Sequence, residues 1–353
     1  MLEKFINIGE KVVVGQDQKP VVVAEVSANH GQSLDSAKEL ISRIAESGAD
    51  AIKLQTYTPE SMTLAQETEE FRIKQWTRDW EGKTAFELYQ VAQTPWDWHP
   101  ALFDHARALG IEIFSSPFSS DAVDFLESLD CPAYKIASYE NTDVNLLRYV
   151  AKTGKPIIVS TGSSTLLDVS RAVDELQRAG AEDIILMKCT SSYPAPANEL
   201  NIRSIPYLSQ LFGVPVGFSD HSIGIGAAVA SVALGATVIE KHVMLETGPK
   251  TPDSHFSLTT GELQQLVTAV SDSFLALNEI PFGVTDSEAH GVLSKRSLFY
   301  RRSLGAGEVV TPDSLVCLRP IVGLPASELD HVLGRKLKTS VEEGSPVQSG
   351  DLV

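Results

Sequence analysis

The sequence has few of the features that mark secreted, membrane or nucleic-acid-binding proteins. Its three cysteines (Cys131, Cys189 and Cys317) are widely spaced and form no CxxC motif, so we expect neither a disulfide framework nor a structural zinc site, as in a cytoplasmic protein. No apolar run approaches the roughly 18 residues of a membrane span, and the N-terminus lacks a signal-peptide pattern. Basic residues are also few: 29 lysines and arginines stand against 46 aspartates and glutamates, and the formal net charge is −17. This balance argues against nucleic acid or an anionic membrane as a partner.

Apolar runs separated by helical patterns dominate residues 21–277. The length of 353 residues suggests two domains at roughly 150 residues each. Continuous apolar runs predict strands that are buried on both faces and therefore pair in parallel. The eight runs are 21–28, 51–57, 112–118, 133–138, 156–162, 183–190, 214–221 and 237–243. Eight βα units of this length predict a (β/α)8 TIM barrel over residues 1–277. A doubly wound open sheet is the alternative, although no GxGxxG motif follows the first run.

Two further segments depart from this pattern. Residues 58–96 form the one long insertion, which carries Trp76, Trp80 and Trp96, and we expect a partly helical excursion over one mouth of the barrel. Residues 278–296 resemble a linker, and residues 297–353 consist of short strand-like pieces with turn residues. A weak repeat relates 303–316 to 340–353 at an offset of 37, which predicts a small β-rich domain with internal symmetry.

Polar residues follow the predicted strands at their C-terminal ends, where barrel enzymes carry their active sites. Burying so many polar groups is costly without compensation, which favours a functional role over a structural one. They include Glu25, Asn29, His30, Lys53, Gln55, Ser115, Ser116, Lys135, Ser138, Glu140, Ser160, Thr161, Lys188, Thr190, Tyr193, Ser219, Asp220, His221, Glu240 and His242.

Two lysines and two histidines carry the chemical interpretation of these strand ends. Lys53 and Lys135 stand in apolar strands, and two ammonium groups at one mouth predict an anionic substrate that carries phosphate or phosphate plus carboxylate. The alternative is a pair of separately salt-bridged lysines. His221 and His242 end the seventh and eighth strands, which adjoin in a barrel, so both imidazoles can reach one metal ion. The alternative is two structural histidines. We expect Cys189 to be a small buried hydrophobe.

The same segments resemble the sialic acid synthase family, and most closely its pseudaminic acid synthase branch. The matching stretches are AEVSANHGQSL (24–34), KLQTYTP (53–59), SSPF (115–118), YKIASYE (134–140), STG (160–162), KCTSSYP (188–194), GFSDHSIG (217–224) and IEKH (239–242). CLRPIVGLP (317–325) and LGRKL (333–337) are similar to the antifreeze-like SAF domain that follows the barrel in this family.

The resemblance implies an enzyme that condenses phosphoenolpyruvate with an N-acylated amino sugar and acts as a domain-swapped homodimer. It also implies a divalent metal, often Mn²⁺, with Co²⁺ or Mg²⁺ as other choices. The expected sugar is 2,4-diacetamido-2,4,6-trideoxy-L-altrose and the product pseudaminic acid. N-acetylmannosamine and the legionaminic acid precursor stay open as alternative sugars. A non-catalytic sugar- or phosphate-binding barrel is the alternative from another functional class.

The resemblance also implies roles for individual residues, by position. Phosphoenolpyruvate binding is expected at Lys53, Ser116, Lys135, Ser138, Ser160 and Ser219, and metal binding at His221 and His242. Catalytic roles are expected for Glu25, Glu140, Tyr193 and Asp253, and sugar binding for Gln55 and Arg319. Arg319 matches an arginine that the SAF domain sends into the site of the partner subunit.

Overall fold

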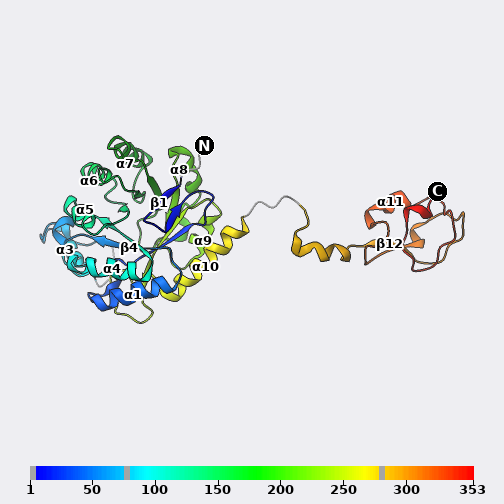
Figure 1. The fold of residues 1–353 in the computed structure, drawn as a ribbon, viewed down its shortest axis with the longest axis horizontal. Helices are drawn as coiled ribbons and strands as arrows, with labels where there is room; N and C mark the ends of the chain where they lie inside the picture. The colour runs from blue at the N-terminus through cyan, green and yellow to red at the C-terminus, as the bar shows by residue number, and fades with distance from the viewer. Residues whose placement is uncertain (1–4, 75–79, 278–282) are drawn as a thin grey trace. The chain divides into compact units, whose positions relative to one another are not determined.

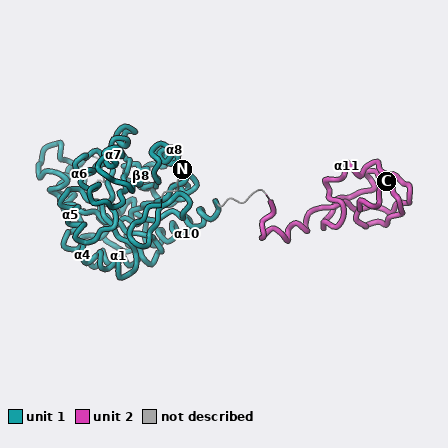
Figure 2. Tube along the Cα trace, turned by 45° about the horizontal axis from the view of Figure 1, so that its top comes forward, with its two compact units in different colours: residues 1–278 teal, residues 279–353 magenta. Residues whose placement is uncertain are grey.

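The computed structural model describes residues 5–74, 80–277 and 283–353. The chain divides into two compact units, residues 1–278 and residues 279–353, which Figure 2 distinguishes by colour. Among the described residues, no helix has both the length and the apolar character needed to cross a membrane.

The first unit contains a closed barrel of eight parallel strands. Each strand pairs with the next along the chain, and β10 pairs with both β9 and β3, which closes the ring. The strands are β3 (Val21–Glu25), β4 (Ala51–Thr56), β5 (Glu112–Pro117), β6 (Tyr134–Ile136), β7 (Ile157–Ser160), β8 (Ile184–Cys189), β9 (Val216–Ser219) and β10 (Val238–Met244). A two-residue strand, β11 (Leu258–Thr259), also pairs with β10. The predicted eight-stranded barrel is therefore confirmed, and the open-sheet alternative is wrong.

Helices surround the strands, as Figure 1 shows. They are α1 (Leu34–Glu46), α4 (His99–Leu109), α5 (Ser120–Glu127), α6 (Val144–Ala151), α7 (Leu166–Arg178), α8 (Ser204–Phe212), α9 (Gly226–Val232) and α10 (Thr260–Ala276). In α1 the Ser33 side chain caps the first turn by accepting a hydrogen bond from the Ser36 amide. The buried residues of α1, Ala37, Leu40, Ile41 and Ile44, recur at the spacing of one helical face. Local sequence thus determines both where this helix starts and which face meets the strands.

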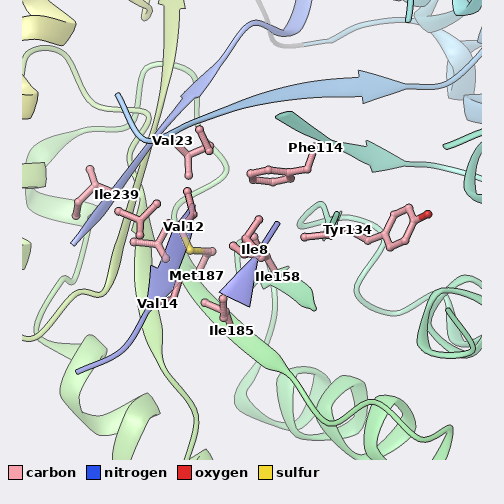
Figure 3. Packing of buried hydrophobic residues seen from close by; sticks show 14 of the residues in the cluster. Ile8, Val12, Val14, Val23, Phe114, Tyr134, Ile158, Ile185, Met187 and Ile239 are labelled. Carbon is pink, nitrogen blue, oxygen red and sulfur yellow. The ribbon is translucent and has the colours of Figure 1, made fainter. Parts of the chain in front are cut away.

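An N-terminal hairpin, β1 (Ile6–Ile8) and β2 (Val12–Val14), closes the end of the barrel at which the strands begin. Its Ile8, Val12 and Val14 pack among the core side chains in Figure 3. The carboxylate of Glu112, the first residue of β5, accepts hydrogen bonds from the amides of Glu10 and Lys11 at 3.0 and 3.2 Å. The apolar pattern of the sequence does not predict this hairpin. With one end filled by apolar side chains, only the C-terminal ends of the strands remain for polar chemistry.

The insertion after β4 is partly helical, as predicted. It contains α2 (Pro59–Met62), η2 (Glu69–Phe71), α3 (Ala85–Ala92) and η3 (Trp96–Trp98). The Thr84 side chain and Glu87 form a reciprocal capping box that starts α3. Trp76 lies outside the described residues.

The second unit is small and built from two related halves. Strands β12 (Ser297–Tyr300) and β13 (Leu315–Leu318) pair antiparallel, and its short helices are η5 (Asp286–Ser294), η6 (Pro312–Ser314), η7 (Ala326–Glu328), α11 (Leu329–Val332) and η8 (Ser349–Asp351). η6 and η8 occupy equivalent positions of the 37-residue repeat, and a bridge joins the equivalent residues Leu304 and Val341. Internal symmetry is therefore present in the structure. Of the segment expected to be a linker, residues 278–282 lie outside the described residues, and η5 occupies most of the remainder.

Candidate active site

Four charged side chains from four strands meet at the C-terminal end of the barrel. They are Glu25, Lys53, Lys135 and Glu240, all of them at most 3% exposed. The Lys53 ammonium forms an ion pair with Glu25 and lies 3.0 Å from Oε1 of Glu240. The Lys135 ammonium lies 3.7 Å from the same Glu240 oxygen. The two lysines therefore converge and share one carboxylate, which contradicts the alternative of two separate salt bridges.

Burial and neighbouring charge act in opposite directions within this group. Burial lowers the pKa of the Lys53 ammonium, but Glu240 and Glu25 outweigh it and hold that pKa well above its usual range. For Lys135 burial prevails, and its pKa lies below the usual value despite the attraction of Glu240. Burial alone would raise the pKa of Glu240, yet Lys135 and Lys53 hold it well below its usual range. Glu240 is therefore a carboxylate, and Lys135 is the lysine whose charge is more easily lost.

Hydroxyl groups surround the lysines. Ser160 Oγ accepts a hydrogen bond of 2.6 Å from the Lys135 ammonium, and Ser219 Oγ donates one of 2.9 Å to Glu240. Ser116 Oγ is buried and has no hydrogen-bond partner among the described residues. A Cβ atom at Gly162 would lie 2.6 Å from Ser138 Oγ, so glycine is needed for the backbone to approach this hydroxyl. A buried hydroxyl without a partner is costly, and a substrate oxygen would satisfy Ser116.

His221 and His242 lie side by side, with ring centroids 5.3 Å apart. His221 Nδ1 lies 3.1 Å from the Thr190 carbonyl oxygen and donates to it, which leaves Nε2 as the nitrogen with a free lone pair. His242 lies 3.7 Å from the Asp253 carboxylate through Nδ1 and 4.0 Å from Glu25 through Nε2. His242 Nδ1 is buried and has no hydrogen-bond partner among the described residues.

This histidine pair fits a divalent metal ion. Two imidazoles bound to one ion at about 2.1 Å place their ring centroids about 5 Å apart, close to the separation found here. The Thr190 carbonyl accepts a hydrogen bond from Nδ1 of His221 and so fixes this ring, as is usual for histidines that bind a metal. In the described part of the chain, no three His, Cys, Asp or Glu residues are grouped as metal ligands, so two imidazoles would hold the ion and leave other positions open.

A cavity of about 460 Å³ opens beside the histidines. The predicted residues Gln55, Glu140, Tyr193 and Asp253 all line it, together with Ser138 and His242. Gln55 donates a hydrogen bond of 2.7 Å to Glu25, and Asp253 accepts one of 3.2 Å from the Ala28 amide. The structure thus brings together every site residue that the sequence predicted in the first unit.

Glu140 has an unusual environment within this cavity. Burial raises the pKa of its carboxyl to about 7 from an ordinary value of 4.5. Its Oε2 atom is buried and has no hydrogen-bond partner among the described residues. A carboxyl that exchanges its proton near neutral pH is suited to general acid or base chemistry.

Arg319 belongs to the second unit, where it directly follows β13. Its expected place in the site of a partner subunit stays a prediction.

Some residues of the site received no role from the sequence. Glu240 was recognised as polar, but its position between two lysines depends on barrel closure. Phe256 packs against both histidine rings, with centroids 4.8 Å from His242 and 6.0 Å from His221. Cys189 is buried as expected, and its sulfur lies 3.7 Å from His221 Nδ1. A sequence signal existed only for Glu240, as a charged residue in an apolar strand.

Comparisons with known proteins agree with this geometry. A model of the NeuB family matches residues 40–280, and a model of the SAF domain matches residues 295–353. Pseudaminic acid synthase from Helicobacter pylori is 42% identical over 340 residues, which cover 95% of this chain and 98% of that protein. N,N′-diacetyllegionaminic acid synthase from Legionella pneumophila is 33% identical over 336 residues, covering 94% of each chain. The crystal structure of N-acetylneuraminic acid synthetase from Leptospira borgpetersenii superposes with a TM-score of 0.71 at 27% identity, covering 82% of this chain and 95% of that one.

Proposed function

Because the chain belongs to the NeuB family, we propose that it is a pseudaminic acid synthase. It condenses phosphoenolpyruvate with 2,4-diacetamido-2,4,6-trideoxy-L-altrose and releases phosphate. The pseudaminic acid synthase from Helicobacter pylori is 42% identical to this chain over nearly the full length, and the legionaminic acid synthase from Legionella pneumophila is 33% identical. The higher identity supports the L-altrose derivative over the legionaminic acid precursor. The observation that carries the proposal is that two buried lysines converge on one carboxylate while His221 and His242 lie side by side, with His242 lining the cavity. This arrangement suits an anionic substrate next to a carbonyl compound.

Phosphoenolpyruvate occupies the lysine side of this site in our proposal. Lys53 and Lys135 provide two ammonium groups for its phosphate and carboxylate. The buried hydroxyls of Ser116, Ser138, Ser160 and Ser219 bind the remaining oxygens, and that of Ser160 contacts the Lys135 ammonium. The substrate anions take over contacts that Glu240 makes when substrate is absent.

His221 and His242 hold a divalent metal ion, for which Mn²⁺ is our first choice and Co²⁺ or Mg²⁺ are alternatives. A metal at this position supplies Lewis-acid activation of the sugar aldehyde. The Thr190 carbonyl would orient His221 for this role, and the Asp253 carboxylate lies 3.7 Å from Nδ1 of His242, beside the second ring.

The reaction forms one carbon–carbon bond and one carbon–oxygen bond, the latter to water, and breaks the carbon–oxygen bond to phosphate. C3 of phosphoenolpyruvate attacks the aldehyde carbon of the open-chain sugar, and water adds to C2. The resulting tetrahedral intermediate expels phosphate by cleavage of the C2–O bond. Glu25 and Glu140 are the candidates for the proton transfers, and the raised pKa of Glu140 supports its part in them. Tyr193 and Asp253 complete the catalytic wall of the cavity, and Gln55 binds the sugar.

We further propose a cytoplasmic, domain-swapped homodimer in which Arg319 reaches the site of the partner subunit. The SAF-domain match over residues 295–353 and the sequence resemblance around Arg319 support this assembly. A guanidinium group would present several fixed donors to acyl or hydroxyl oxygens of the sugar.

A phosphate-release assay tests the proposal. The full-length chain is supplied with phosphoenolpyruvate, Mn²⁺ and one of three sugars: the L-altrose derivative, the legionaminic acid precursor or N-acetylmannosamine. We expect phosphate release to be fastest with the first sugar, together with a product of the mass of pseudaminic acid. Faster turnover of either other sugar would replace the proposed substrate. Binding of phosphoenolpyruvate without turnover of any sugar would favour a non-catalytic barrel.

A further inference from the structure

The cavity beside the histidines has two chemically different sides. Its polar side comes from the strand ends and the loop before α10, and carries Gln55, Glu140, His242 and Asp253. Its other side comes mainly from the insertion after β4 and carries no charged residue. We call this second side the apolar wall; it consists of Met62, Ile73, Ala85, Leu88, Ala92 and Phe118, and Tyr89 of α3 lies in the same lining and adds one hydroxyl group.

The apolar wall is attached to the barrel by aromatic contacts. Tyr57, which directly follows β4, packs its ring edge-on against Tyr89 of α3 at 5.7 Å and against Phe118 at 5.4 Å. Leu88 is only 8% exposed although it lines the cavity. The wall is therefore a supported surface of the cavity.

We infer that the apolar wall binds the distal end of the sugar and selects substrates that carry a C6 methyl group and a C4 acetamido group. This inference rests on the proposed function. It adds that residues of the insertion determine which sugars the enzyme accepts.

The position of the reacting carbon orients the sugar. Its aldehyde carbon must lie close to phosphoenolpyruvate, hence on the side of the lysines and His242. The opposite end of the open chain then extends toward the insertion, which forms the remaining side of the cavity. The C6 methyl and the acetamido methyl at C4 are apolar groups, and burial against Leu88 and Ile73 removes them from water.

A sugar with hydroxyl groups at these positions fits poorly for the same reason. N-acetylmannosamine carries hydroxyls at C4 and C6, for which the six side chains of the apolar wall offer no hydrogen-bond partner; the neighbouring Tyr89 supplies the one hydroxyl that α3 contributes to the cavity. Apolar pockets discriminate between a methyl and a hydroxyl by roughly 10- to 100-fold. The legionaminic acid precursor shares the C6 methyl and the C4 acetamido group. The wall therefore favours the two 6-deoxy sugars over N-acetylmannosamine. It does not distinguish the L-altrose derivative from the legionaminic acid precursor, which is left to the polar residues of the cavity.

Substitutions in the wall test this inference through a ratio of two sugars. Leu88→Gln and Ile73→Thr each place a hydrogen-bonding group on the wall. We expect each variant to lower kcat/KM for the 6-deoxy diacetamido sugar by about 10-fold or more. For N-acetylmannosamine we expect kcat/KM to be unchanged or raised, and the KM for phosphoenolpyruvate to stay at the wild-type value. Thermal unfolding checks that the variants fold. If Leu88→Gln does not fold, Ile73→Thr still tests the inference.

Val91→Thr is the matched control, because Val91 lies on the same helix but is 41% exposed and does not line the cavity. It should leave the ratio of the two sugars unchanged. Suppose that the wild-type enzyme turns over the diacetamido sugar, but both wall variants change kcat/KM for the two sugars by the same factor. The wall then does not select the sugar, and the inference is wrong. If wild-type enzyme turns over no sugar, it is the proposed function that fails.

Discussion

The ammonium nitrogen of Lys53 lies 3.0 Å from Oε1 of Glu240, although β3 separates their two strands in the barrel. Glu240 thereby reaches across the end of β3 and also attracts Lys135. A carboxylate that contacts both lysines competes with the anionic groups of a substrate. Burial disfavours the charged form of a lysine, and the Glu240 carboxylate opposes this effect for both lysines.

Replacement of Glu240 should change the pH dependence of phosphoenolpyruvate binding. Burial already lowers the pKa of Lys135, and the Glu240 carboxylate opposes that shift. Glu240→Gln should lower the pKa further. The ammonium form exists below its pKa and is lost as pH rises through it, so the KM for phosphoenolpyruvate should begin to rise at a lower pH than in wild type. Steady-state kinetics between pH 6.5 and 9.5 measure this, with exposed Glu246→Gln as the control. Superimposable profiles would exclude this role of Glu240.

The two lysines should differ in their effect on stability. Lys53→Ala and Lys135→Ala each remove a charge-assisted contact, typically about 1.5–3 kcal/mol, and should weaken phosphoenolpyruvate binding roughly 10- to 100-fold by calorimetry. Lys53 forms ion pairs with both Glu25 and Glu240, whereas Lys135, among the described residues, forms an ion pair with Glu240 alone and donates a hydrogen bond to Ser160. Loss of Lys53 leaves the buried Glu25 carboxylate without its lysine partner, so Lys53→Ala should lower Tm more than Lys135→Ala. Unchanged affinity in either variant would return that lysine to a purely structural role.

The sequence was sufficient to predict the barrel and most of the site, because both depend on local patterns. A strand buried on two faces must be apolar, so charged residues such as Lys53 and Lys135 within it are conspicuous. The hairpin of β1 and β2 was missed because each of its strands has only three residues, and their apolar runs are too short to stand out.

Contacts between distant strands account for what the sequence left open. The position of Glu240 depends on the pairing of β10 with β3, which joins the last barrel strand to the first. The apolar wall combines an insertion with Phe118, a residue that follows another strand, and no periodicity in the sequence connects them. Such contacts form only when the barrel closes.

Removal of the metal should abolish turnover. His221 and His242 are the proposed ligands, so EDTA should eliminate activity and Mn²⁺ or Co²⁺ should restore it. His242→Ala should lose Mn²⁺ binding by isothermal titration calorimetry while its circular dichroism spectrum stays unchanged. His105→Ala is the control, because its ring contacts Ser42 between α4 and α1, in the outer layer of helices. Full activity of metal-free enzyme would contradict the assignment.

Glu140 should destabilise the folded chain at alkaline pH. Its pKa is about 7 in the folded protein and 4.5 ordinarily, so the folded state holds the proton more tightly between these values. The free energy of unfolding therefore falls as pH rises from 4.5 to 7. Glu140→Gln carries no such proton and should be more stable than wild type by about 1–3 kcal/mol at pH 8, with little difference near pH 4.5. Urea unfolding at both pH values measures this, with exposed Glu39→Gln as the control. An equal effect of Glu140→Gln at both pH values would contradict the raised pKa.

Complementation between two inactive variants should reveal whether Arg319 completes the site of a partner subunit. Lys53→Ala removes a lysine of the barrel site, and Arg319→Ala alters the second unit of the chain. In a mixed dimer with shared sites, one site carries both lesions and the other carries neither, so activity should return toward one quarter of wild type when subunits exchange at random. If each chain completes its own site, every site keeps one lesion and the mixture stays inactive. Mass spectrometry of differently tagged chains establishes that exchange has occurred. Inactivity despite exchange would therefore assign Arg319 to its own subunit or to a role outside the site.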